Sequence, residues 1–119
     1  MNIVSEELAT AMNATAATVP AEANEFEIAG LTPITGTVVK APMVAESPAS
    51  MECRTTHVVA VGSHPRPSLV VFGEVVRFHL RKGVMADGRV DLDRLLPVGR
   101  MSGAGYVRTR DRFSMERPA

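Results

Sequence analysis

A chain of 119 residues has room for one domain with a hydrophobic core, which argues against a second domain. Hydrophobic residues make up 45% of the chain and aromatic residues only 4%, so we expect a globular core filled by aliphatic side chains. The formal net charge is zero, but residues 1–60 carry two basic and seven acidic side chains, whereas residues 61–119 carry eleven and six. Either the C-terminal half binds anions or the two halves neutralise each other.

The first third of the chain predicts helical structure. Glu6 and Glu7 supply an acidic first turn, which favours a helix over residues 5–12. A second short helical turn is expected to end at Gly30, because glycine readily adopts the left-handed conformation that closes a helix. The β-branched residues that follow favour a strand over residues 34–39.

Two longer strands are predicted over residues 50–61 and 69–81. The residues between them, 62–68, are dense in turn formers, so an antiparallel pairing is expected. Alternation along the second strand places one set of large apolar side chains on a single face, which we interpret as the core face. That set is Val70, Phe72, Val76, Phe78 and Leu80.

The C-terminal third predicts short, tightly turned elements. Residues 86–88 carry a turn signal, and residues 91–96 are expected to form a helical turn. Three glycines then fall within residues 99–105, which favours a backbone that another group can approach closely. Antiparallel strands with helices at the start indicate an α+β, mainly β fold, either a barrel or a curved sheet.

Residues 100–105 are the best local candidate for a ligand site. The guanidinium of Arg100, beside glycine-rich backbone, could offer donors to an anion or a carbonyl, although an ordinary surface loop would look the same. Tyr106 could stack on a planar ring or simply pack. His79 ends a strand between Arg77 and Arg81, so its imidazole is a catalytic candidate near neutral pH, with a structural role as the alternative.

Other chemistries have less support in the sequence. Glu52 lies in an apolar strand and is expected to pair with Arg54 or Arg77. Cys53 is the only thiol, so no disulfide within the chain and no cysteine-based metal site can form, and we expect no metal. No apolar run is long enough for a membrane span, and the interpretation is a cytoplasmic protein without a membrane partner.

One strip of arginines near the C-terminus is a possible feature of a nucleic-acid-binding protein. Arg108, Arg110 and Arg112 alternate, so an extended chain would place them on one face. Nearby aromatic residues are sparse and the net charge is zero, so no nucleic-acid partner is expected.

Several segments, taken in order, resemble the flavin-reductase-like domain family, which consists of FMN-binding split β-barrels. They are Asn2–Ala9, Phe26–Pro33, Glu52–Cys53, Gly73–His79, Asp87–Asp91, Pro97–Arg100 and Tyr106–Phe113. The resemblance implies a Greek-key antiparallel barrel that forms a homodimer and binds FMN. It also implies hydride transfer from NADH or NADPH to the flavin, often for a partner oxygenase.

The resemblance places residues at the cofactor. Arg100, Gly103 and Tyr106 would lie where a late loop approaches the flavin or the second subunit, and His79 occupies a recurrent position in the last barrel strand. Family members usually carry Gly-Gly-Asn before the aromatic residue. Here the stretch is Ser102–Gly105, so a contact from that Asn amide is lost.

The family's early strands and phosphate-binding loops have no counterpart in this sequence, so the domain is expected to be incomplete at its N-terminus. We divide the single domain 1–119 into a helical lead-in (1–31), barrel strands (32–82) and C-terminal loops and tail (83–119). Such a chain is expected to bind FMN weakly or not at all, and to be inactive alone. The alternatives are a non-enzymatic fragment, stable only as an oligomer or with a partner chain, and a barrel that binds another planar ligand.

Overall fold

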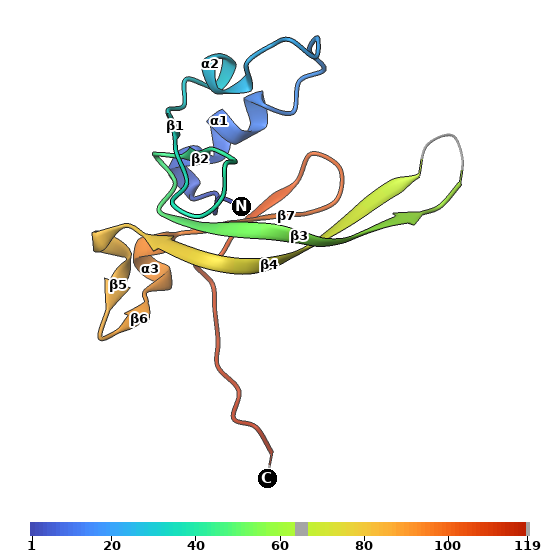
Figure 1. Cartoon of the computed structure of the whole chain (residues 1–119). Coiled ribbons are helices and arrows are strands. Elements are labelled where there is room, and N and C mark those ends of the chain that lie inside the picture. The colour runs from blue at the N-terminus through green and yellow to red at the C-terminus, as the bar shows by residue number, and fades with distance from the viewer. Residues whose placement is uncertain (64–66, 119) are drawn as a thin grey trace.

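A long antiparallel ribbon of two strands dominates the structure, a computed structural model that describes residues 1–63 and 67–118 (Figure 1). Strand β3 (Ala49–Val61) pairs with strand β4 (Ser68–Leu80) along nearly its whole length. Both predicted strands and their antiparallel pairing are therefore confirmed. Part of the predicted turn between them, residues 64–66, lies outside the described residues.

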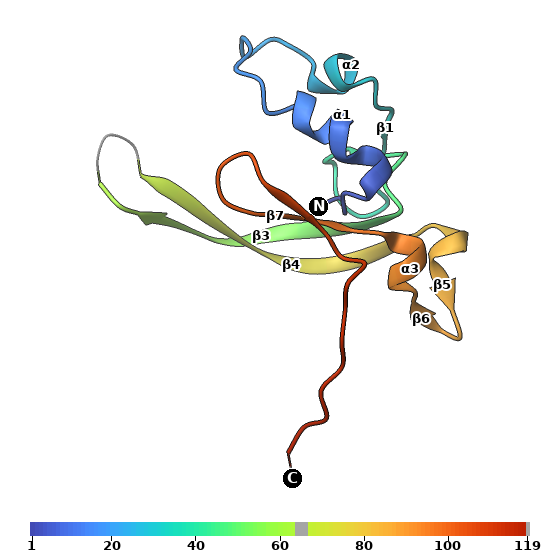
Figure 2. The same cartoon turned by 180° about the vertical axis from the view of Figure 1, so that it is seen from behind.

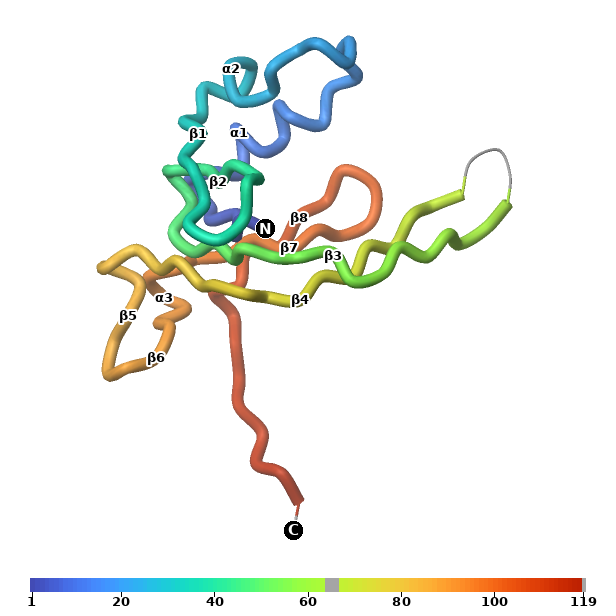
Figure 3. Tube along the Cα trace, viewed as in Figure 1, coloured from blue at the N-terminus to red at the C-terminus, as the bar shows by residue number. Residues whose placement is uncertain are grey.

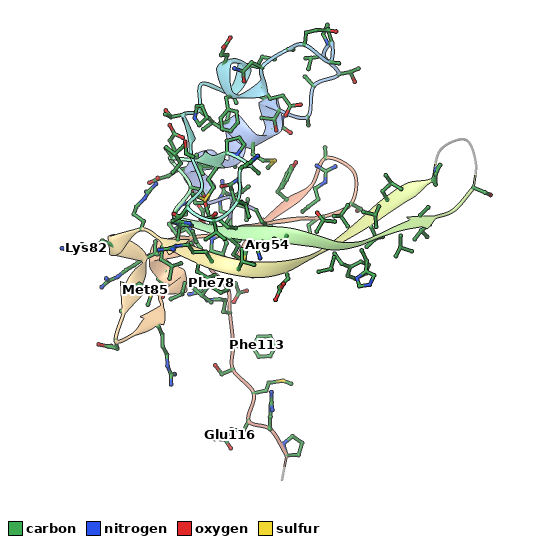
Figure 4. All side chains as sticks on the ribbon, viewed as in Figure 1. Arg54, Phe78, Lys82, Met85, Phe113 and Glu116 are labelled. Atoms are coloured by element: carbon green, nitrogen blue, oxygen red, sulfur yellow. The ribbon has the colours of Figure 1, made fainter. Side chains whose placement is uncertain are left out.

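Two bulges interrupt the ribbon and change which side chains share a face. The register shifts between Glu52 and Cys53 and again between Thr55 and His57. The extra residue is Val76 on β4 at the first shift and Thr56 on β3 at the second, so a single period of two describes neither strand. The predicted core face was wrong in this chain, since Phe72 is 52% exposed and Phe78 65% exposed. Figure 4 labels Phe78 beside the ribbon.

The N-terminal helices lie on one side of the ribbon (Figure 2). The predicted helix over residues 5–12 is a 3₁₀ turn, η1 (Glu6–Leu8), that continues as α1 (Ala9–Ala14), so it extends two residues further than predicted. Helix α2 (Glu25–Ala29) ends at Gly30, whose φ is 65°, as predicted. The Asn24 side chain caps its start by accepting the amide of Phe26 at 3.1 Å.

The strand predicted over residues 34–39 was wrong beyond its first residue. Strand β1 (Pro33–Ile34) pairs only with β2 (Met43–Val44), and the chain bends between them. A buried carboxylate on β3 takes the backbone amides of residues 37–39, and those amides can then not join a ladder. Residue 36 must be glycine there, because a Cβ would lie 2.5 Å from the Val39 carbonyl oxygen.

Short elements follow β4 in the order that the sequence indicated. The two-residue turn of the hairpin formed by β5 (Met85–Ala86) and β6 (Arg89–Val90) has positive φ at Asp87 (50°) and Gly88 (74°), which confirms the turn over residues 86–88. The predicted helical turn is α3 (Leu92–Leu95), with Asp91 as its cap. The elements are η2 (Lys82–Val84), β5 (Met85–Ala86), β6 (Arg89–Val90), α3 (Leu92–Leu95), β7 (Val98–Arg100) and β8 (Tyr106–Arg108).

Within the described residues, the strands form four separate two-stranded sheets, and the barrel is not closed. The described buried core is small, with Ala49, Val84 and Leu95 as one cluster and Ile3 packed against it. The radius of gyration is 16.7 Å, whereas a compact domain of this length would have about 13.5 Å. The C-terminal tail extends away from the other elements, as the tube in Figure 3 shows.

Candidate functional site

The β7–β8 hairpin brings the three predicted cofactor-binding residues together. One terminal nitrogen of the Arg100 guanidinium donates to the Tyr106 hydroxyl at 2.7 Å, and the other donates to the Gly103 carbonyl at 2.6 Å. Arg100 and Tyr106 face each other across the hairpin, and the guanidinium carbon lies 4.9 Å from the tyrosine ring centroid. Gly103 has φ of 60°, which lets the turn fold back toward Arg100.

This cluster keeps the capacity to bind a ligand. An arginine has five N–H donors, and the two hydrogen bonds within the hairpin leave others available. The Tyr106 side chain is only partly covered, at 38% exposure for the residue. An exposed phenol ring with a guanidinium fixed beside it can stack on a planar ring and donate to its carbonyl oxygens.

A cavity of about 420 Å³ lies beside this face of the hairpin. Its volume falls within the range of small-molecule sites, roughly 300 to 1,000 Å³. The walls are apolar except for one tyrosine, one glutamate and one arginine. The lining residues are Glu6, Ala9, Val98, Tyr106, Val107 and Arg108.

The charged wall of this cavity is an ion-pair network that sequence analysis missed. Arg110 binds both oxygens of the Glu6 carboxylate, at 2.8 and 2.9 Å, and Arg108 approaches the same carboxylate at 3.2 Å through Nε. The hydrogen bonds from Arg110 hold the pKa of Glu6 below its usual range. Glu6 and Arg110 are 104 residues apart, so no local pattern in the sequence pointed to the contact.

A second cluster surrounds Glu52, which is 1% exposed. Its carboxylate accepts three consecutive backbone amides, those of Thr37, Val38 and Val39, at 2.6 to 2.9 Å. It also contacts Nε2 of His79 at 2.5 Å. The predicted pairing with Arg54 or Arg77 was wrong, because backbone amides and an imidazole satisfy this carboxylate instead.

The surroundings of Glu52 determine its charge. Burial would raise the pKa of its carboxyl group, but the hydrogen bonds from His79 and the three backbone amides outweigh burial and lower the pKa to about 2. Glu52 is therefore ionised at neutral pH, and an ionised carboxylate accepts hydrogen bonds only. It follows that Nε2 of His79 carries a proton and that Nδ1 is the atom left for another partner.

His79 is placed with Glu52, while Arg100, Gly103 and Tyr106 form their own cluster. His79 lines a different cavity, of about 270 Å³, together with residues of β2 and the end of β4. Its side chain is 32% exposed. The structure thus gathers the three cofactor-binding candidates and assigns the catalytic candidate a buried carboxylate partner.

The described residues form neither a metal-binding cluster nor a membrane-spanning helix. Within residues 1–63 and 67–118, no group of three His, Cys, Asp or Glu side chains is arranged to hold a metal ion. In the same ranges, no helix is long and apolar enough to cross a membrane. Cys53 is half-buried on β3, and its thiol donates to the Met51 carbonyl.

Comparison with protein families identifies the domain. The family model described as "Flavin reductase like domain" matches residues 1–96. Uncharacterised proteins from Halalkalibacterium halodurans, Aquifex aeolicus and Deinococcus radiodurans are 32%, 37% and 36% identical over at least 91% of this chain. The chain spans only 52% to 57% of the length of these relatives.

Solved structures agree with the family model. Component B of nitrilotriacetate monooxygenase from Bacillus cereus superposes on 96% of this chain, with a TM-score of 0.88 and 33% identity, over 57% of its own length. The 2-nitrobenzoate 2-nitroreductase NbaA of Pseudomonas fluorescens covers 99% of this chain, with a TM-score of 0.84 and 28% identity, over 58% of its own length. Flavoredoxin of Desulfovibrio vulgaris shares the fold at 22% identity, with a TM-score of 0.78. The chain therefore belongs to the flavin reductase like domain family.

Proposed function

We propose that this chain is the flavin-binding part of a flavin-associated oxidoreductase, in which NADH or NADPH reduces bound FMN. The observation that supports this most directly is the Arg100–Tyr106 pair, whose tyrosine lines a cavity of about 420 Å³, in a chain that belongs to this family. An exposed aromatic ring, a fixed guanidinium and a cavity with both apolar and charged walls suit a planar heterocycle with carbonyl groups.

The residues present fit FMN. Tyr106 would cover one part of the flavin ring, and Arg100 would donate to a carbonyl oxygen while its bond to the Gly103 carbonyl keeps it in place. When bound, the flavin supplies the redox chemistry, since it accepts two electrons from a reduced nicotinamide. The chain's own residues bind the ring, orient it and hold water away from one side.

His79 is proposed as a proton-holding or ligand-binding group through Nδ1, because Nε2 is committed to Glu52. Replacing it with glutamine tests the role, since an amide N–H can still donate to the Glu52 carboxylate. We expect His79→Gln to keep the fold and to lower flavin-dependent NAD(P)H oxidation. His57→Gln is the matched control, because His57 lies exposed on β3 against Phe72. Equal activity of His79→Gln and wild type would assign His79 to structure alone.

The proposal extends to partners and compartment. Nitrilotriacetate monooxygenase component B is by its name one component of an oxygenase system, so we propose a partner oxygenase for this protein as well. We also propose a homodimer, since a large apolar surface of the β3–β4 ribbon is exposed. A cytoplasmic location suits a chain with a single cysteine.

The test of the flavin site is an FMN titration of the purified chain and of its Arg100→Ala variant. We expect Arg100→Ala to raise the dissociation constant for FMN about tenfold, as the loss of one charge-assisted hydrogen bond would. Its thermal midpoint should change little, because Arg100 is exposed. An unchanged dissociation constant in a folded variant would remove Arg100 from the site.

A second candidate function is a non-enzymatic fragment that is stable only as an oligomer or with a complementary chain. The expanded radius of gyration and the exposed apolar strands favour it. NAD(P)H oxidation that depends on added FMN would decide for the reductase. Its absence, together with a mass above that of a monomer in solution, would decide for the fragment.

A further inference from the structure

Arg108 lines the cavity, but the proposed flavin contacts of Arg100 and Tyr106 make no use of its charge. Strand β8 carries Tyr106 and Arg108 two residues apart, so both side chains are on the same face of the hairpin. The register places Val98 opposite Arg108 and Arg100 opposite Tyr106 on this face. Two residues along a strand span roughly 7 Å, so a ring stacked on Tyr106 would hold its substituents within reach of Arg108.

The charge of Arg108 is not cancelled by its contact with Glu6. Arg110 occupies both oxygens of the Glu6 carboxylate in a bidentate pair, and Arg108 reaches one of them only through Nε. The Arg108 side chain is 74% exposed. Within the described residues, its two terminal nitrogens have no hydrogen-bond partner. Two arginines on one carboxylate leave one net positive charge at the wall of the cavity.

A guanidinium whose Nε is held by a carboxylate, and whose terminal nitrogens have no hydrogen-bond partner, can donate those terminal N–H groups to an oxyanion. Arginine binds phosphate with paired N–H donors, and fixing one nitrogen reduces the freedom lost on binding. The position of Glu6 is itself fixed, since its backbone amide donates to the Leu96 carbonyl at 2.9 Å and the neighbouring residue Ser5 bridges to Pro97. Glu6 therefore holds Arg108 against the same cavity that Tyr106 lines.

We propose that Arg108 binds the phosphate of a nucleotide whose ring stacks on Tyr106, and that Glu6 is the positioning residue that holds Arg108 for this contact. The proposal rests on the proposed flavin function, because it names the group of the ligand that this side of the site recognises. The phosphate belongs either to the flavin nucleotide or to the nicotinamide nucleotide. Two pairs of ligands that differ only by a phosphate distinguish these sources, namely FMN with riboflavin and NADPH with NADH.

The experiment compares FMN with riboflavin, which lacks the phosphate, by fluorescence titration of wild type and Arg108→Gln. We expect wild type to prefer FMN, and Arg108→Gln to weaken FMN binding about tenfold while leaving riboflavin binding unchanged. Arg108→Lys should keep part of the preference for FMN that Arg108→Gln loses, because lysine keeps the positive charge but lacks the paired N–H donors of a guanidinium. Arg89→Gln, an exposed change on β6, is the control and should keep the wild-type ratio.

The role of Glu6 has its own variants. Glu6→Gln removes the charge that holds Arg108, so the ratio of FMN to riboflavin affinity should fall, and Glu6→Asp should recover part of it. A merely structural role for Glu6 would lower the thermal midpoint but leave this ratio unchanged. An unchanged ratio in Glu6→Gln would overturn the positioning role.

The remaining outcomes distinguish the sources and the proposals. If Arg108→Gln instead removes a preference for NADPH over NADH, the phosphate is that of the nicotinamide nucleotide, and phosphate binding by Arg108 stands. If Arg108→Gln keeps both preferences, the inference is wrong even though flavin binds. If no flavin binds to wild type, the proposed function fails. Phosphate binding by Arg108 is then tested separately, by following the NMR signal of its Nε–H while inorganic phosphate is added. A shift of the Arg108 Nε–H signal then supports it, and an unmoved signal overturns it.

Discussion

Glu52 and its four hydrogen bonds link three parts of the chain, namely β3, the end of β4 and the bend at residues 37–39. A buried carboxylate is stable only when its lone pairs are satisfied, and here each oxygen accepts two hydrogen bonds. The bend, the histidine and the carboxylate therefore depend on one another. Removal of any one leaves buried polar groups without partners.

The ionised Glu52 carboxylate makes the stability of the fold depend on pH. The folded pKa of Glu52 is lowered from 4.5 to about 2, so the stability that this carboxylate contributes is present above pH 4.5 and is lost as pH falls toward 2. In Glu52→Gln, the NH₂ group of the side-chain amide faces backbone N–H donors, so the variant should be less stable than wild type at neutral pH. Because glutamine does not titrate, the unfolding midpoint of the variant should also depend less on pH between pH 2 and pH 4.5.

Chemical denaturation of wild type and Glu52→Gln between pH 2 and pH 6 measures the effect. Glu74→Gln is the matched control, because Glu74 is exposed on β4. If Glu52→Gln follows the wild-type pH profile, the carboxylate contributes no linked stability and the account of the 37–39 bend is wrong.

Among the elements, α3 holds the described core together despite its four residues. Leu95 is 8% exposed and packs in the cluster with Ala49 of β3 and Val84. Leu95→Ala should lower the free energy of unfolding by about 2 to 5 kcal/mol, as expected for a buried leucine. Leu92 is 43% exposed on the same helix, so Leu92→Ala should cost less than about 0.5 kcal/mol.

Urea denaturation of both variants checks this comparison. Equal losses in Leu95→Ala and Leu92→Ala would mean that α3 does not pack on β3 in solution. A larger loss in Leu95→Ala would establish that the short C-terminal elements, and not only the ribbon, carry the stability of this chain.

The elements also show what the sequence alone could predict. The stop at Gly30, the 86–88 turn and the helical turn within residues 91–96 are set by signals within a few residues, and the sequence predicts all three. Arg100, Gly103 and Tyr106 fall within one hairpin for the same reason. The bend at 37–39 and the Glu6–Arg110 pair depend on residues 13 to 15 and 104 positions away, so local propensity could not reveal them.

At the scale of the molecule, the exposed apolar surface is the main feature. Large apolar residues of β3 and β4 stay exposed, among them Val58, Leu69, Val71 and Phe78. Burying such a surface is favourable at roughly 25 cal/mol per Å² of apolar area, so it favours association with another chain. We therefore expect the purified chain to have a mass in solution above 12.7 kDa.

Light scattering coupled to size exclusion measures that mass. Phe78→Ser should shift the chain toward a monomer, since Phe78 is 65% exposed on the ribbon. Phe113→Ser is the control, because Phe113 is 86% exposed on the extended tail and lies away from the ribbon (Figure 4). A monomeric wild type would contradict the assignment of the ribbon face to an interface.

The most direct test of the account is the FMN titration of the purified chain and of its Arg100→Ala variant, followed by flavin fluorescence and the visible spectrum. The account predicts saturable but weak binding by the chain, and a further loss of affinity in the variant. Absence of any saturable binding, or tight binding that Arg100→Ala leaves unchanged, would contradict the assignment of the β7–β8 hairpin to the flavin.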